Sequence, residues 1–302
     1  MLDVFKIYKR NMKVTGFTII RNAIKYDYPV VEAINSVLPL CDEFIVGVGN
    51  SEDETLALIK SIDSPKIKII ESVWDDSLRE GGKLLSVETN KVFDAIDPSS
   101  NWCFYIQSDE VLHEKYHEVI LKRMQSYKND KNVEGLLFNY KHFYGNYNYV
   151  GNSRRWYKSE IRIIKNDKNI RSYKDAQGFR KKDDTKLSVI HSDASIYHYG
   201  WAKPPKAQQA KQQNFHKMWH DDEWLNKNIG IAEEFDYSDI DNLKIFKGTH
   251  PKVMLEKIQK DNWDFKYDDS KIKVSFKDRI ALFIEKKTGW NPGEYKNYKL
   301  LK

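Results

Sequence analysis

Two carboxylates follow directly after an apolar run near residue 105. The run Trp102–Ile106 is continuous and apolar, as is typical of a strand buried on both faces, and Gln107, Ser108, Asp109 and Glu110 come next. Carboxylates at the end of a buried strand contribute little to packing, but they are well placed to bind a hard cation through oxygen. The spacing leaves an alternative equally open, in which Asp109 and Glu110 only cap the next helix.

The elements that must position these carboxylates alternate between strand and helix patterns. Strands are predicted over 14–20, 44–48, 66–70 and 102–106, with amphipathic helices between them. This order predicts a mostly parallel sheet with right-handed crossovers, flanked by helices. Lysines alternate along 66–70, which favours a place near the sheet edge.

Polar loops leave the carboxyl ends of the first two strands as well. Arg21 and Asn22 follow the first strand, and Asn50, Ser51 and Asp53 follow the second. In an open parallel sheet, ligands bind where such loops converge. We therefore expect these side chains and the acidic cluster to share one ligand site.

The pattern changes after about residue 133. The segments 136–144, 160–165, 170–173, 187–191 and 195–199 are predicted to be strands joined by turns, and helical patterns return beyond residue 203, notably over 275–287. We expect a catalytic domain over residues 1–202 and a helical C-terminal extension over 203–302. The extension would pack on that domain or on a partner subunit in a homo-oligomer.

The order of these loops resembles the GT-A glycosyltransferases of family 2. The segments that carry the resemblance are 16–22 (GFTIIRN), 49–55 (GNSEDET) and 105–110 (YIQSDE), and it covers roughly residues 14–205. The resemblance implies a GT-A-like α/β fold. It also implies transfer of a sugar from a nucleotide-diphosphate donor to a glycan or lipid-linked acceptor.

The resemblance further assigns roles to individual residues. The loop after the second strand would contact the nucleotide, and Asp109 aligns with the acid that touches a Mn²⁺ or Mg²⁺ ion. Gln107 stands where the family has its first acid, so Glu110 is a candidate to contribute. His198 resembles the late metal ligand of such enzymes, although a lone histidine is often a core or surface residue. The predicted donor-binding residues are Arg21, Asn22, Asn50, Ser51, Asp53, Gln107 and Ser108, and the predicted metal ligands are Asp109, Glu110 and His198.

An acceptor hydroxyl must lose its proton as it attacks the sugar, and a carboxylate is the usual base. Inverting members of the family use an aspartate in this role. Asp175, in the loop after a predicted hairpin, is our candidate, and Glu160 competes because it begins a strand in the same region. For each of them the alternative is an ordinary surface carboxylate.

The amino-acid composition excludes several classes of protein. Among 302 residues the net charge is 50 − 44 = +6, which suits an anionic substrate, but the basic residues are scattered and predict no nucleic-acid site. Two cysteines exclude a disulfide scaffold or a zinc ribbon. Lacking a signal-like or membrane-spanning stretch, the chain is expected in the cytoplasm, free or peripherally at the inner face of the membrane.

Two other functions remain open on the sequence. One is a GT-A-fold nucleotide-binding protein that has lost catalysis, which Gln107 makes plausible. The other is a sugar nucleotidyltransferase, although the loop at Arg21 lacks the glycines that class usually has after its first strand.

Overall fold

The structure is a computed structural model that describes residues 11–78, 81–217, 219, 223–224, 227, 232–238, 240, 242–267, 280–281, 283, 287–288 and 295–301. Most of the helix predicted over 275–287 lies outside the described residues. None of the described helices is long and apolar enough to cross a lipid bilayer.

The first half of the chain builds four parallel strands. They are β1 (Val14–Ile20), β2 (Glu43–Gly49), β3 (Ile67–Ser72) and β4 (Trp102–Tyr105), in the spatial order β4-β1-β2-β3. Every residue of β1 is buried, because the strand lies inside the sheet, whereas β3 lies at its edge as the alternating lysines predicted.

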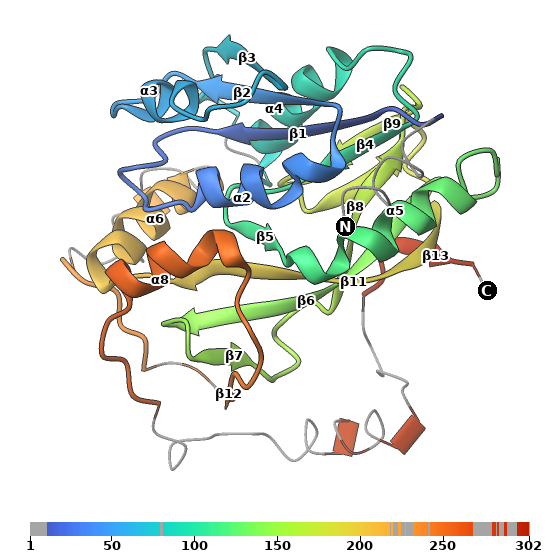
Figure 1. Cartoon of the computed structure of the whole chain (residues 1–302). Helices are drawn as coiled ribbons and strands as arrows, with labels where there is room; N and C mark the ends of the chain where they lie inside the picture. Colours follow the sequence, from blue (N-terminus) through green and yellow to red (C-terminus); the bar gives the residue numbers. More distant parts are fainter. Residues whose placement is uncertain are drawn as a thin grey trace.

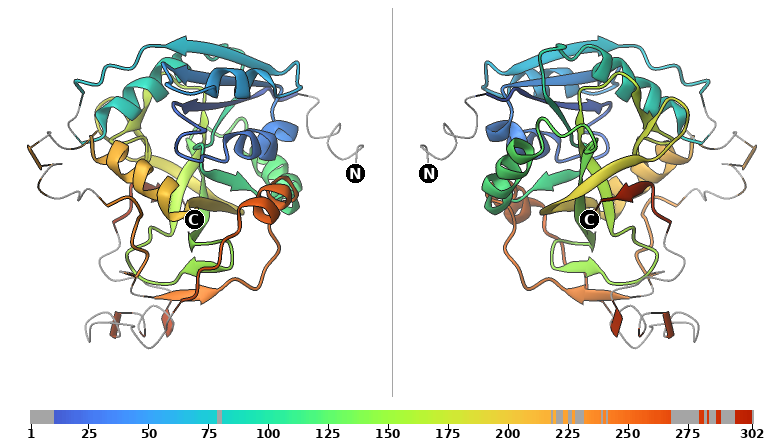
Figure 2. Two further views of the ribbon diagram at one scale, coloured as in Figure 1. Left: turned by 90° about the vertical axis from the view of Figure 1, so that its left-hand side faces the viewer. Right: turned by 90° about the vertical axis from the view of Figure 1, so that its right-hand side faces the viewer.

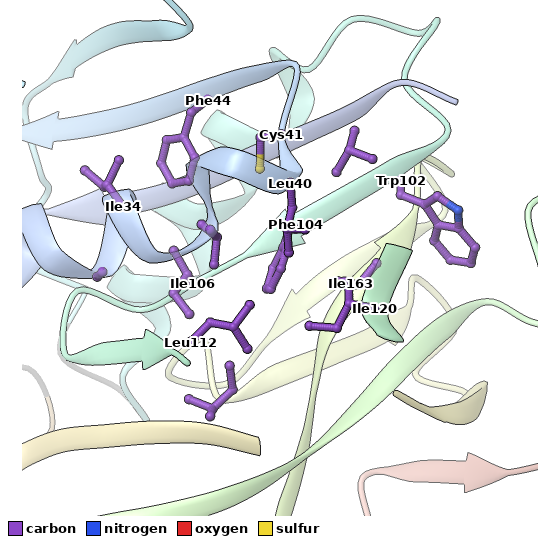
Figure 3. Packing of buried hydrophobic residues seen from close by; sticks show 14 of the residues in the cluster. Ile34, Leu40, Cys41, Phe44, Trp102, Phe104, Ile106, Leu112, Ile120 and Ile163 are labelled. Atoms are coloured by element: carbon purple, nitrogen blue, oxygen red, sulfur yellow. The ribbon is translucent and has the colours of Figure 1, made fainter. Parts of the chain in front are cut away.

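Helices cover both faces of this half. They are α2 (Val30–Val37), α3 (Thr55–Lys60), α4 (Lys83–Asp94) and α5 (His117–Ser126). In Figure 2, α2 and α5 lie on one side of the strands and α4 lies on the other. One apolar cluster, which includes Ile34, Phe44, Phe104 and Ile120, fills the α2–α5 side (Figure 3), and a second, around Phe17 and Phe93, fills the α4 side.

The second half continues the sheet with mixed pairing. Strand β8 (Ser159–Lys165) is antiparallel to β4, β6 (Gly135–Gly145) is antiparallel to β8, and β11 (Leu187–Ala202) is parallel to β6. Short strands complete the arrangement: β5 (Glu110–Leu112) on β11, β7 (Tyr149–Gly151) on β6, and the separate pair β9 (Ile170–Tyr173) with β10 (Gly178–Lys181).

Strand β11 corrects the prediction of two strands at 187–191 and 195–199. It is one strand whose register with β6 shifts between His191 and Ser195. Asp193 has a φ of 59° there, and the Ser192 hydroxyl donates to the Leu137 carbonyl oxygen at 2.8 Å. The polar pair therefore forms a bulge, because strand pairing resumes on the same neighbour instead of reversing.

The segment beyond residue 203 contributes helices and strands. Helix α6 (Pro205–Lys217) lies beside the carboxyl ends of the parallel strands (Figure 1), and α8 (Leu255–Asp261) is joined to the loop before α2 by the ion pair of Lys257 with Asp27. Strand β12 (Leu243–Ile245) pairs with β7 and β13 (Tyr298–Leu300) pairs with β11. The described part of this segment is thus joined to the sheet and is not helical throughout.

Eleven of the thirteen described strands form one curled sheet flanked by helices, and β9 and β10 form a separate pair. The prediction of an α/β fold with a large central sheet flanked by helices is confirmed. Parallel pairing dominates the first half only.

Candidate functional site

A cavity of about 260 Å³ opens at the carboxyl ends of β1 and β4, with helix α6 along one side. It joins residues from the loops after both strands to residues of β11 and α6. Its charged and polar lining residues include Arg21, Gln107, Ser108, Asp109, Asp175, His198 and Lys211. Six of the twelve side chains predicted for chemistry therefore meet in one place.

Asp109 lies at the floor of this cavity, in the turn between β4 and β5, and is 8% exposed. Its Oδ2 atom accepts a hydrogen bond from the Lys211 ammonium at 2.9 Å, and its Oδ1 atom lies 3.6 Å from Nε2 of His198. Burial alone would raise the pKa of Asp109, but Lys211 and His198 outweigh it and hold that pKa well below its usual range. Asp109 is therefore a carboxylate, not a carboxylic acid, near neutral pH.

The β11–β6 register places His198 opposite His142. The Nδ1 atoms of the two rings are 2.9 Å apart, and Nε2 of His142 lies 2.8 Å from the Tyr157 carbonyl oxygen. A carbonyl oxygen only accepts, so Nε2 of His142 is the donor there; burial lowers the pKa of His142 to about 3 and keeps the ring neutral. His198 must then donate from Nδ1, which turns its Nε2 atom toward Asp109.

Gly200 makes the close approach of Asp109 and His198 sterically feasible. A Cβ atom at this position would lie 2.6 Å from Oδ2 of Asp109 and 2.7 Å from Nε2 of His198. Any larger residue would have to displace one of these two groups. The glycine therefore belongs to the site, although its sequence context does not mark it.

Glu110 faces a different environment from its neighbour Asp109. Both of its carboxylate oxygens accept from the Arg162 guanidinium at 2.7 Å, and Oε1 also accepts from the Tyr140 hydroxyl at 2.7 Å. Glu110 and Arg162 are fully buried. The Glu110 carboxylate therefore holds the loop that carries Asp109 in place, and its charge is balanced by Arg162.

The Gln107 side chain also has a partner within the protein, because its Nε2 atom donates a hydrogen bond to the Ala176 carbonyl oxygen at 3.1 Å. A Mn²⁺ or Mg²⁺ ion would thus find two suitable ligand atoms, Oδ1 of Asp109 and Nε2 of His198. The Lys211 ammonium already binds the same Asp109 carboxylate. Within the part of the chain that the structure describes, no three His, Cys, Asp or Glu side chains cluster as a metal site. The donor set does not fit a metal ion held by the protein alone.

The donor-binding residues predicted from the first two loops divide between hollows. Arg21 lines both the first cavity and a neighbouring one of about 280 Å³, which Asn22 and Asn50 also line. Ser51 and Asp53 line a third hollow, which Asn50 also lines.

Several of these polar groups connect the loops to each other. The Asn22 side-chain oxygen accepts from the Glu52 backbone N–H at 2.7 Å, and Oδ2 of Asp53 accepts from the Lys25 backbone N–H at 2.8 Å. Arg21 reaches the cavity edge with its guanidinium 4.8 Å from the Trp74 ring centre. It forms an ion pair with Asp76 at 2.8 Å.

The two candidates for the base occupy different positions. Asp175 lines the first cavity, and burial raises its pKa. Glu160 is 3% exposed and is not among the cavity's lining residues; its Oε1 atom accepts from Gln177 at 2.8 Å. The geometry therefore favours Asp175.

Sequence reasoning missed Lys211 and His142. Lys211 is one of many scattered lysines, and nothing in its local pattern separates it from the others. His142 lies in an apolar strand 56 residues before the histidine it contacts. Only the strand register and the position of α6 reveal either of them.

No protein-family model matches the chain, and no curated protein matches it. Among solved structures, it is similar to 4-diphosphocytidyl-2C-methyl-D-erythritol synthase from Anaerococcus prevotii, at 12% identity over 53% of this chain and 73% of that one, with a TM-score of 0.33. It is also similar to glucosyl-3-phosphoglycerate synthase from Mycobacterium tuberculosis in complex with Mn²⁺, uridine diphosphate and phosphoglyceric acid. That match has 15% identity over 48% of this chain and 47% of that one, with a TM-score of 0.31. The chain thus spans about half the length of the glucosyl-3-phosphoglycerate synthase, and a similarity this low carries no argument about its activity.

Proposed function

We propose that the protein is a glycosyltransferase that uses a nucleotide-diphosphate sugar as donor. One observation carries the proposal: Asp109, a buried and ionised carboxylate at the end of β4, meets His198 and Lys211 inside a cavity at the carboxyl ends of the parallel strands. This is the edge of an open α/β sheet where ligands bind.

The two neighbouring cavities suggest how a donor would lie. They share Arg21 and Asn214, so one extended molecule could occupy both. The nucleotide would lie toward Asn22 and Asn50, the diphosphate would pass between Arg21 and Lys211, and the sugar would reach Asp175. Charged groups at the centre and aromatic side chains such as Tyr157 and Trp201 around the sugar end suit such a ligand.

In the transfer, Asp175 would accept the proton of the acceptor hydroxyl as the hydroxyl oxygen attacks the anomeric carbon. The bond from that carbon to the nucleotide diphosphate breaks, and the diphosphate leaves. Burial raises the pKa of Asp175, which makes its carboxylate a stronger base. A Mn²⁺ or Mg²⁺ cofactor remains a prediction, since Asp109 and His198 do not fit a metal ion held by the protein alone. A glycan or lipid-linked acceptor, inversion at the anomeric carbon and contact with a membrane surface remain predictions.

Gln107 favours a second function, that of a nucleotide-binding protein without catalytic activity. This residue supplies no charge where a first acid is expected, and its amide is bound to the Ala176 carbonyl oxygen. A protein that binds the nucleotide without turnover would need the cavity but not an acid at position 107.

The test is a thermal-shift panel of UDP, GDP, CDP and dTDP with and without Mn²⁺, followed by donor hydrolysis and transfer assays. We expect one nucleotide to raise the melting temperature and the matching sugar donor to be consumed. Asp109→Ala should abolish turnover, whereas Asp63→Ala, at an exposed carboxylate before β3 on the opposite edge of the sheet, should not. Nucleotide binding without turnover across many acceptors supports the second function, and no response to any nucleotide contradicts both.

A further inference from the structure

Lys211 is a buried cation in the centre of the candidate site. It is 9% exposed, although lysine is rarely buried without a partner. Its ammonium donates to Oδ2 of Asp109 and to the Gly200 carbonyl oxygen, each at 2.9 Å, and lies 5.1 Å from the Tyr28 ring centre. Because Lys211 also lines the cavity, this charge can meet a bound ligand.

A second buried lysine nearby, Lys203, does not face the cavity and cannot meet a ligand there. The ammonium of Lys203 donates to the carbonyl oxygens of Tyr26 at 2.7 Å and Asp27 at 3.0 Å, and Lys203 does not line the cavity. Burial lowers its pKa well below the usual range. Lys203 therefore supports the loop after β1, while Lys211 is directed at the site.

The ammonium of Lys211 and a divalent ion would compete for one carboxylate. Both charges are positive, and a metal ion on Asp109 would lie within a few ångströms of the ammonium in a poorly screened environment. Arg162 engages Glu110 on both oxygens, so that carboxylate does not offset the extra charge. The protein thus already holds one cation where the metal ion was predicted.

From these contacts we propose that Lys211 is the site's own counter-cation for the donor's diphosphate, so that nucleotide-diphosphate binding does not require a divalent metal ion. The proposal rests on the proposed function, because it concerns the same donor. Asp109 fixes the position of the ammonium, and the phosphate oxygens accept hydrogen bonds from the ammonium when the sugar donor enters. Arg21 provides the second positive charge at the cavity edge.

The experiment is isothermal titration of the full chain with UDP, GDP, CDP and dTDP, in EDTA and again with Mn²⁺. We expect the nucleotide that binds to do so in EDTA with a Kd close to its value in Mn²⁺. Lys211→Gln should raise the Kd in EDTA by roughly tenfold to a hundredfold, the effect of losing one charged hydrogen bond. Lys206→Gln is the matched control, since Lys206 is an exposed lysine on the same helix.

A second variant, Lys211→Arg, separates the loss of the positive charge from misfolding of Lys211→Gln. Lys211→Arg retains the positive charge, so it should bind more tightly in EDTA than Lys211→Gln if both variants keep the circular dichroism spectrum of the parent. Titration with Mn²⁺ alone should give weak or no binding to the parent and tighter binding to Lys211→Gln, because Asp109 is then free of its ammonium.

The outcomes separate this inference from the proposed function. Binding of a nucleotide only in the presence of Mn²⁺ overturns the role of Lys211 and leaves the glycosyltransferase proposal standing. Equal affinity of the parent and Lys211→Gln in EDTA also overturns it. No binding of any nucleotide under either condition overturns both.

Discussion

The guanidinium of Arg162 binds the carboxylate of Glu110 through two parallel hydrogen bonds of 2.7 Å, with both side chains fully buried. The guanidinium also lies 5.5 and 5.3 Å from the ring centres of Tyr105 and Tyr140. This pair joins β8 to the first residue of β5, directly after Asp109. The position of the cavity floor therefore depends on a contact beneath it.

Removing one partner of this pair should destabilise the fold strongly. Arg162→Met leaves the Glu110 carboxylate buried without its counter-charge, and we expect a loss of about 3–5 kcal/mol in the free energy of unfolding. Urea denaturation followed by circular dichroism measures it. Lys122→Met, which breaks the exposed pair of Lys122 with Glu118, should cost less than about 1 kcal/mol. Equal losses in the two variants would contradict the prediction.

Glu160 should make stability depend on pH. Burial raises its pKa from 4.5 to about 7, so the folded state holds this proton more tightly than the unfolded state does. The resulting stabilisation is present below pH 4.5 and is lost as the pH rises to about 7. The difference between these two pKa values corresponds to roughly 3 kcal/mol. Glu160→Gln should remove this part of the slope, and parallel stability curves for the parent and the variant would refute the assignment.

Gly200→Ala should damage the site more than the fold. The added methyl group meets the far ends of Asp109 and His198, which can move aside without unfolding the strand. We expect a loss of about 1–3 kcal/mol in stability and a nucleotide affinity at least roughly tenfold weaker. A melting curve and a nucleotide titration on the same sample give both values. An unchanged affinity would show that Asp109 and His198 do not contact the ligand.

Asp175 and Glu160 can be separated as candidates for the base by their kinetics. Asp175 lines the cavity and Glu160 does not, so Asp175→Asn should lower kcat by about 10²–10⁴-fold with little change in the KM of the donor. Glu160→Gln should retain most of the parent's kcat. The assignment to Asp175 is wrong if the two variants behave in the opposite way.

The local patterns of the sequence determined the main frame of this protein. The buried runs of β1, β2 and β4 and the helices between them were predicted from hydrophobic periodicity, because burial on one or two faces imposes a period within a few residues. The same patterns placed Arg21, Asn50 and Asp109 after strands whose carboxyl ends share one edge. Of these three, Arg21 and Asp109 line the same cavity, whereas Asn50 lines the neighbouring one.

The tertiary structure alone decided which partners these residues have. Lys211 reaches Asp109 across 102 residues, and Arg162 reaches Glu110 across 52. Such contacts depend on strand register and on where α6 packs, and a local hydrophobic pattern specifies neither. For the same reason two adjacent acids, indistinguishable in sequence, have different surroundings: Asp109 faces the cavity, while Glu110 is held beneath it by Arg162.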